Sequence, residues 1–133
     1  MNTPVALHTP LSSADLISLR AGDAVRLSGA VYTARDAAHI KIAAAAAKNA
    51  PLPFDFNGAL LFYAGPAPAR PGKVIGPIAP TTARRMDGWL ELTCKLGAAG
   101  SIGKGGRSAE AAEICARYKR VYFLSYGGLA ALT

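Results

Sequence analysis

The chain has 133 residues, of which 51% are hydrophobic and 17% are charged, which suits one folded domain and argues against disorder. Its formal net charge is +7, but the basic residues are scattered and no basic–aromatic RNA-binding motif is present, so we expect no nucleic-acid partner. No apolar run reaches the roughly 18 residues of a bilayer span and no signal peptide is apparent, so we expect a cytoplasmic protein with no membrane contact.

The first half of the chain predicts two helices and two strands. A capping-box pattern at residues 12–15 opens a short helix to about Arg20. Residues 24–32 alternate at first between apolar and polar, as a half-buried strand does. An alanine-rich helix follows residues 35–39 and ends near Asn49, because prolines come next. Residues 59–64 form a short apolar run that predicts a buried strand.

The second half continues the alternation of strands and helices. In chain order it predicts a proline-rich loop over residues 65–72, a strand at 73–76, a helix from 80 to 96, a glycine-rich loop at 101–106, a helix over 108–118 and a strand at 121–126. Such alternation predicts an α/β fold. We expect one domain that spans residues 1–133.

The glycine-rich segment at residues 100–108 is one candidate for binding chemistry. It departs from the P-loop pattern at Ala98 and Gly105, and it lacks the dinucleotide-binding pattern. Its backbone amides and the cations Lys104 and Arg107 suit a carboxylate or phosphate. A plain surface turn with solvated charges is the alternative.

Residues 80–87 form a second candidate. Thr81 and Arg85 are four residues apart, so on a helix they share one face. A hydroxyl, a guanidinium and the amides of a helix start could then form an anion site with a proton carrier. The alternative is a helix cap with a surface arginine pair, in which Thr82 is the expected cap.

Arg35 lies at a predicted strand-to-helix junction, where open α/β sheets bind ligands. Asp36 could instead hold Arg35 in a structural ion pair. His39 could serve as an acid–base group, but a single histidine on an alanine-rich helix is more often structural or exposed.

Five motifs in a fixed order carry a family resemblance. They are Arg-Asp-Ala-Ala-His at 35–39, Tyr-Ala-Gly-Pro at 63–66, Pro-Thr-Thr-Ala-Arg-Arg-Met-Asp at 80–87, Ile-Gly-Lys-Gly at 102–105, and a tyrosine-rich strand ending in Gly-Gly at 121–128. Together they resemble the β component, or C-terminal domain, of class I iron–sulfur fumarate hydratases and L-tartrate dehydratases.

The resemblance implies a swivelling β/β/α domain, which is a three-layer α/β fold with a mixed sheet and flanking helices. It also implies a hetero-oligomeric hydro-lyase whose α subunit carries a [4Fe-4S] cluster on three cysteines, with an open iron that acts as a Lewis acid on a small dicarboxylate. Carried over by motif, Arg35, Arg85 and Lys104 bind the substrate carboxylates. Thr81 is the proton-transfer residue, sharing that role with a carboxylate of the α subunit.

The cysteines and two departures from the family pattern shape the remaining expectations. Cys94 and Cys115 cannot supply three cluster ligands, so we expect the isolated chain to bind no cluster and to be inactive. Ala79 stands where the family has glycine, and the chain ends at Thr133, which is short for the family. The alternative function is a non-catalytic module that binds an anion or a partner on the same fold.

Overall fold

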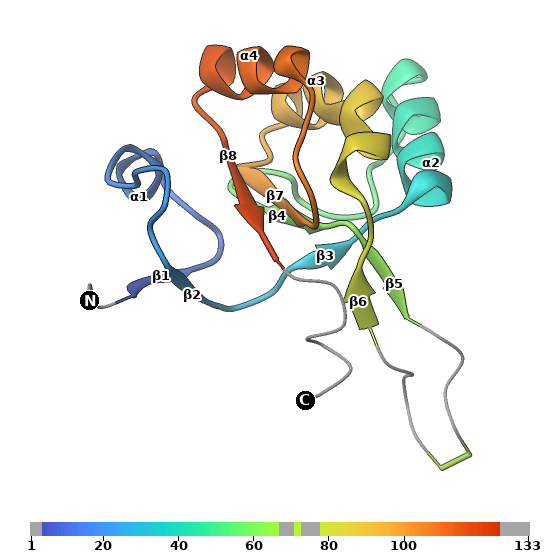
Figure 1. The fold of residues 1–133 in the computed structure, drawn as a ribbon. Helices are drawn as coiled ribbons and strands as arrows, with labels where there is room; N and C mark the ends of the chain where they lie inside the picture. Colours follow the sequence, from blue (N-terminus) through green and yellow to red (C-terminus); the bar gives the residue numbers. More distant parts are fainter. Residues whose placement is uncertain (1–3, 67–70, 73–77, 126–133) are drawn as a thin grey trace.

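The computed structural model describes residues 4–66, 71–72 and 78–125 (Figure 1). In chain order its elements are β1 (Val5–His8), α1 (Ser13–Ile17), β2 (Val25–Ser28), β3 (Tyr32–Thr33), α2 (Asp36–Ala47), β4 (Leu60–Phe62), β5 (Ala64–Pro66), β6 (Ile78–Pro80), the 3-10 helix η1 (Ala83–Met86), α3 (Asp87–Lys95), β7 (Gly100–Gly103), α4 (Ala109–Tyr118) and β8 (Val121–Leu124). Among the described residues, no helix combines the length and apolar character that a bilayer crossing requires.

A parallel sheet forms the centre of the molecule. Its four strands run in the order β3-β4-β7-β8, and β1 and β2 form a separate parallel pair. Strands β5 and β6 form an antiparallel ribbon that projects from the sheet in Figure 1. Helices α2, α3 and α4 gather on one side of the four-stranded sheet, and β1, β2 and α1 lie together away from them.

Alternation along β4 explains the three layers. Leu61 belongs to a buried cluster with Ile42 of α2 and Met86 of η1. Its neighbour Leu60 belongs to a different cluster with Leu7 of β1 and Leu16 of α1. Successive strand residues point to opposite faces, so the central sheet is buried between a helical layer and a smaller β layer. The predicted three-layer α/β fold is therefore confirmed, whereas the described strands of the central sheet are parallel rather than mixed.

The predicted capping box forms as expected. The Asp15 amide donates to Ser12 Oγ at 3.2 Å, and the Ser12 amide donates to Asp15 Oδ2 at 2.9 Å. The helix ends at Ile17, earlier than the expected Arg20. The alanine-rich helix α2 ends at Ala47, within two residues of the prediction.

Several predicted boundaries are wrong. Strand β1 was not predicted, and the strand expected over 24–32 is divided into β2 and β3 around Gly29, whose φ of 94° favours glycine. The loop expected from residue 65 begins with strand β5. The helix expected from residue 80 begins as an α-helix only at Asp87, after β6 and η1. The strand predicted at 73–76 lies outside the described residues.

Strand β7 takes up the first half of the expected glycine-rich loop, residues 101–103, and this correction has a steric cause. A Cβ on Gly100 would collide with the carbonyl oxygen of Val121 in β8. A Cβ on Gly103 would lie 3.0 Å from Ala83 Cβ and 3.1 Å from Tyr63 Cδ2. These two glycines allow close packing of β7 against β8 and η1.

Candidate functional site

Backbone hydrogen bonds hold the turn that carries Thr81. The Thr81 amide donates to the Tyr63 carbonyl at 2.6 Å, and the Lys104 amide donates to the Thr81 carbonyl at 3.1 Å. The Ala83 amide donates to the Lys104 carbonyl at 3.0 Å, and Thr82 and Lys104 form a parallel β-bridge. Thr81 and Lys104 therefore lie side by side at the end of β7.

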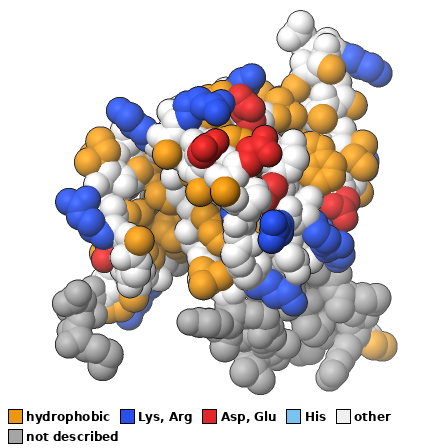
Figure 2. Space-filling model, turned by 45° about the horizontal axis from the view of Figure 1, so that its top comes forward, with side chains coloured by type: hydrophobic (Ala, Val, Ile, Leu, Met, Phe, Trp, Pro, Cys, Tyr) orange, Lys and Arg blue, Asp and Glu red, His pale blue; other side chains and the backbone are white. Residues whose placement is uncertain are grey.

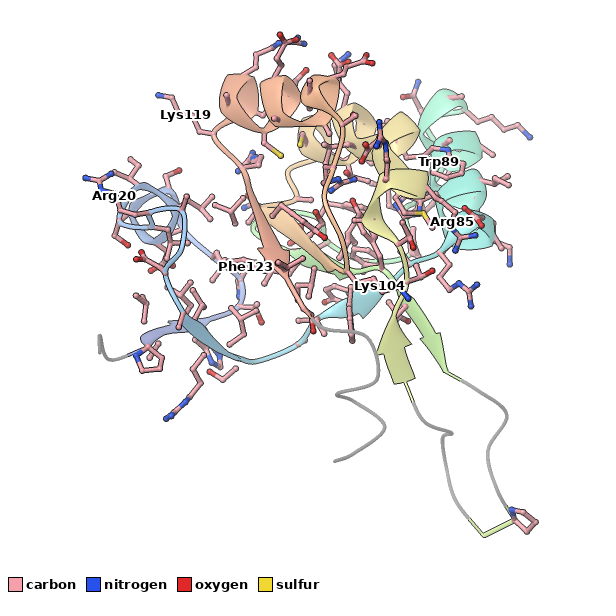
Figure 3. The ribbon with its side chains drawn as sticks, in the orientation of Figure 1. Arg20, Arg85, Trp89, Lys104, Lys119 and Phe123 are labelled. Atoms are coloured by element: carbon pink, nitrogen blue, oxygen red, sulfur yellow. The ribbon has the colours of Figure 1, made fainter. Side chains whose placement is uncertain are left out.

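Arg85 reaches back over this turn. Its Nη2 donates to Thr81 Oγ1 at 2.7 Å, and its Nη1 lies 3.9 Å from Asp36 Oδ2. In Figure 3 the Arg85 and Lys104 side chains lie near each other where β5 and β6 meet η1, whereas Arg20 and Lys119 lie on the opposite side of the molecule. The structure thus brings Thr81, Arg85 and Lys104 together.

Arg35 is connected to this group by the next residue, Asp36, which pairs with Arg85. It occupies the cap position of α2, between β3 and the helix, as predicted. The carboxylate of Asp36 pairs with Arg85 of η1, so the structure does not show the alternative in which Asp36 holds Arg35 in an ion pair. Among the described residues, the exposed Arg35 side chain makes no hydrogen bond or ion pair, and its role stays a prediction.

Two of the amides at the predicted helix start, those of Thr81 and Ala83, are not free. The amides of Thr81, Ala83 and Lys104 are all occupied by backbone carbonyls. Thr82 does hold the cap position of η1, but its side chain makes no capping hydrogen bond. Thr81 would therefore act on a ligand through its side chain rather than through its amide.

The candidate site is open to solvent. The Arg85 side chain is 51% exposed and the Asp36 side chain 49% exposed, so their ion pair contributes at most about 1 kcal/mol to stability. Clefts of about 810 Å³ and about 590 Å³ occur elsewhere, between β2 and β8 and between β3 and α2. Thr81, Arg85 and Lys104 line neither of them.

His39 is buried next to the site rather than exposed in it. Its exposed fraction is 1%, and its ring stacks on Trp89 with centroids 5.1 Å apart. Nδ1 lies 2.9 Å from the Arg35 carbonyl, and the buried Nε2 has no hydrogen-bond partner among the described residues. Burial lowers the pKa of His39, although the Arg35 carbonyl and Asp36 oppose the shift. This environment favours a neutral, packed imidazole.

Acidification should therefore destabilise the chain through His39. The pKa of His39 in the folded state lies below the ordinary 6.5, so the unfolded state binds more protons once the pH drops below 6.5. The contribution of His39 to stability is therefore complete above about pH 6.5 and falls as the pH drops toward the folded-state pKa. The loss approaches about 1.4 kcal/mol per pH unit at most. Urea unfolding between about pH 7.5 and pH 5.5 should show this slope, and His39→Phe should reduce it. An unchanged slope in His39→Phe would assign the effect to other groups.

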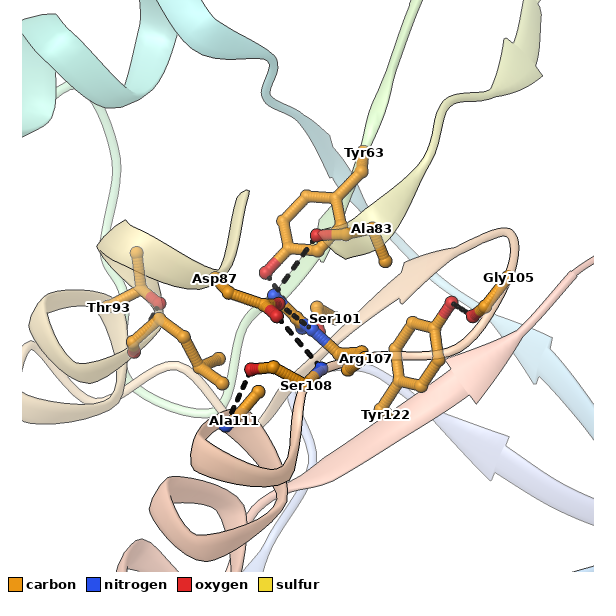
Figure 4. A network of polar contacts seen from close by, with 11 residues as sticks. Tyr63, Ala83, Asp87, Thr93, Ser101, Gly105, Arg107, Ser108, Ala111 and Tyr122 are labelled. Carbon is orange, nitrogen blue, oxygen red and sulfur yellow. Dashed lines mark hydrogen bonds and ion pairs between the residues drawn. The ribbon is translucent and has the colours of Figure 1, made fainter. Parts of the chain in front are cut away.

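Arg107, one of the two cations that the glycine-rich segment offered to an anion, is instead a buried residue with internal partners (Figure 4). Its side chain is 5% exposed, and Nε pairs with Asp87 Oδ1 at 2.6 Å. Nη1 donates to Tyr63 Oη at 3.1 Å and to Ser101 Oγ at 2.8 Å, and Nη2 lies 3.5 Å from the Ala83 carbonyl. No local sequence pattern pairs Arg107 with Asp87, because the two residues are 20 positions apart.

The electrostatics of this network favour an ion pair at neutral pH. Burial alone would raise the pKa of Asp87, but hydrogen bonds from Ser108 and Arg107 outweigh burial and lower it. Burial raises the pKa of Tyr63, so its hydroxyl stays protonated. Burial also opposes the charge on Arg107, yet Tyr63 and Asp87 outweigh it and raise the pKa of Arg107. The guanidinium is therefore satisfied internally and is not free to bind a ligand.

The cysteines lie in the helical layer, away from Thr81. Cys94 is buried in α3, and burial raises the pKa of its thiol to about 11. Burial also raises the pKa of Cys115 in α4. Within the described part of the chain, no three histidine, cysteine, aspartate or glutamate side chains gather as a metal site.

Surface charge is dispersed rather than concentrated in a stripe. On the face seen in Figure 2, lysine and arginine side chains are separated from one another and are interspersed with aspartate and glutamate. The described side chains on this face therefore form no continuous basic stripe.

The chain is similar to subunits and domains of hydro-lyases. The family model described as fumarase C-terminus matches residues 1–133. A Methanocaldococcus jannaschii protein, provisionally named L(+)-tartrate dehydratase subunit beta, is 39% identical over 125 residues, which cover 92% of this chain and 64% of the relative. The L(+)-tartrate dehydratase subunit beta of Escherichia coli K12 is 32% identical over 129 residues, covering 95% and 63%.

A longer relative matches over a smaller share of its length. Fumarate hydratase 2 of Leishmania major is 37% identical over 112 residues, which cover 84% of this chain and 20% of that protein. The chain spans less than two thirds of the length of the tartrate dehydratase subunits that it matches. The match across all 133 residues and the three-layer fold nevertheless agree. This chain belongs to the fumarase C-terminus family.

Proposed function

We propose that this chain is the β component of a hydro-lyase that reversibly adds or removes water on a small dicarboxylate of the fumarate/malate or tartrate type. The observation that supports this most strongly is the 2.7 Å hydrogen bond from Arg85 to the Thr81 hydroxyl, beside Lys104. A cation beside a hydroxyl stabilises the alkoxide that proton transfer requires. Relatives named as tartrate dehydratase and fumarate hydratase support the reaction class.

Arg35, Arg85 and Lys104 would neutralise the two carboxylates of the substrate. A dicarboxylate dianion suits a local group of cations better than a nucleic acid does, because nucleic acids favour an extended basic surface. Arg85 can present two parallel N–H groups to one carboxylate, and Lys104 can act as a point charge. The bound substrate would then lie within reach of the Thr81 hydroxyl.

Thr81 would move the proton in both directions. In dehydration, Thr81 as the alkoxide would take a proton from the carbon next to the one that carries the hydroxyl. The C–O bond breaks as the double bond forms, and the oxygen leaves as water with a proton from a second acid–base group. In hydration, the same hydroxyl returns the proton to carbon. The charge of Arg85 stabilises the alkoxide between these events. The second acid–base group would come from the partner subunit.

The partner is an α subunit that carries a [4Fe-4S] cluster. Cys94 and Cys115 are both packed in the helical layer, and neither belongs to a three-ligand group among the described residues, so the ligands would belong to the partner. When bound there, the cluster supplies a Lewis acid for the substrate hydroxyl and a carboxylate. We place the complex in the cytoplasm, where both thiols stay reduced.

Reconstitution of the pure chain with iron and sulfide should yield no cluster. Two thiols cannot ligate a [4Fe-4S] centre, and a thiol with a pKa near 11 is a poor ligand at neutral pH. Absorbance in the visible region and iron analysis check this. A stoichiometric cluster on the isolated chain would overturn the division of labour between the subunits.

Co-expression with an α component tests the proposed function. We expect the two chains to co-purify and the complex to hydrate fumarate or dehydrate tartrate. A complex that forms but turns over neither a fumarate-type nor a tartrate-type substrate would favour a non-catalytic anion- or partner-binding module.

A further inference from the structure

We infer that Arg107 is a positioning residue for the Thr81–Arg85–Lys104 site, an inference that rests on the proposed function. Its guanidinium contacts four segments that surround the Thr81 turn: Tyr63 between β4 and β5, Ser101 of β7, Ala83 of η1 and Asp87 in the first turn of α3. Arg107 is not among the site residues that the family resemblance implies.

The contacts form a closed path around Thr81. Arg107 binds the Tyr63 hydroxyl, and the carbonyl of Tyr63 accepts the Thr81 amide. Arg107 also approaches the Ala83 carbonyl, while the Ala83 amide donates to Lys104. Lys104 in turn donates to Thr81. The guanidinium therefore binds the two residues whose backbones fix Thr81 and Lys104.

Asp87 fixes the other end of the arginine. Its Oδ1 pairs with Arg107, and its Oδ2 accepts the Ser108 amide at 3.0 Å. This pairing ties the first turn of α3 to the start of α4. Arg85 belongs to η1, directly before α3, so its position relative to Thr81 depends on where α3 begins.

The geometry of the side chain explains why lysine cannot replace it. The guanidinium donates in three directions, to Asp87, to the Tyr63–Ser101 pair and toward Ala83. Its carbon also lies 4.9 Å from the Tyr63 ring centroid and 5.3 Å from that of Tyr122. An ammonium group provides charge without this fork. Replacement of Arg107 by lysine would therefore shift Thr81 and Lys104 slightly from their positions.

The test uses Arg107→Lys, Tyr63→Phe and the control Arg117→Lys. Arg117 is also an arginine paired with a carboxylate, but its side chain is 59% exposed and its partner is Glu91. In the assembled α/β enzyme we expect Arg107→Lys to lower kcat by roughly 10²-fold with a smaller change in KM, because small misplacements of reacting groups have effects of this size. Tyr63→Phe, which removes one hydrogen bond and keeps the ring, should lower kcat by roughly tenfold. Arg117→Lys should leave both constants unchanged.

Amide hydrogen exchange on the full chain provides a readout that needs no activity. Both variants should speed exchange of the Thr81, Ala83 and Lys104 amides by at least roughly tenfold, while the Leu11 amide, bonded to Gly58, exchanges as before. If Arg107→Lys does not fold, Tyr63→Phe decides. Unchanged kcat and exchange in Tyr63→Phe, or equal acceleration at Leu11, would overturn the positioning role. A wild-type complex without turnover would instead overturn the proposed function, and the exchange data would still decide whether Arg107 orders the turn.

Discussion

We expect Thr81→Ala to lower the kcat of the assembled enzyme by roughly 10²–10⁴-fold, the usual contribution of a general acid–base group. The hydroxyl is the only proton-carrying group that Arg85 contacts by hydrogen bond among the described residues. Its methyl and backbone make no charged contact with a ligand, so KM should change by less than about threefold. Steady-state kinetics of the α/β complex with either substrate type provide the measurement.

Thr82→Ala is the matched control for this change. Thr82 is adjacent and exposed, and its side chain makes no capping hydrogen bond. We expect this variant to keep wild-type kinetics because only its backbone pairs with Lys104. Near-normal turnover in Thr81→Ala would remove the proton-transfer role from Thr81. Loss of turnover in a folded His39→Ala variant would do the same.

Arg85→Lys should raise KM by roughly ten- to a hundredfold and also lower kcat. A hydrogen bond to a charged group contributes about 1.5–3 kcal/mol, and 1.4 kcal/mol is a tenfold change in affinity. Lysine keeps the charge but loses the bidentate fork and the 2.7 Å contact with Thr81. The effect should therefore appear in both constants, unlike that of Thr81→Ala.

Arg84→Lys provides the comparison for Arg85. Arg84 is the preceding residue in η1 and is also exposed, but the structure gives it no hydrogen bond to Thr81 or ion pair to Asp36 among the described residues. It should bind substrate as the wild type does. Equal KM values for wild type, Arg84→Lys and Arg85→Lys would place the carboxylate site elsewhere.

Periodicity and turn residues are local signals, so they were enough to predict the α/β class, whereas the three-layer arrangement was implied by the family resemblance. The capping box at Ser12 and Asp15, the end of the alanine-rich helix and the apolar strand at Leu60–Phe62 are all determined by residues close in sequence. The β1 strand escaped notice because four residues carry little pattern. Gly100 indicated a loop, but it allows close contact with β8, a tertiary cause that no local pattern reveals.

In the candidate site, too, some contacts follow from local spacing and others depend on the tertiary fold. The spacing of Thr81 and Arg85 suggested their contact, although they meet across a turn and a 3-10 helix instead of along one α-helix. The pairing of Lys104 with Thr81 depends on β7 lying beside the turn, and the burial of Arg107 depends on four segments meeting. Both are long-range consequences of the fold. Motif resemblance identified the first and gave no indication of the second.

Titration of this chain into a fixed amount of cluster-loaded α component tests the central claim most directly. We expect the initial rate of dicarboxylate hydration or dehydration to rise with added chain and to saturate at one chain per α component. The Thr81→Ala chain should saturate at the same ratio with a rate lower by roughly 10²-fold or more. A rate that does not depend on the added chain, or that is equal for wild type and Thr81→Ala, would contradict the account.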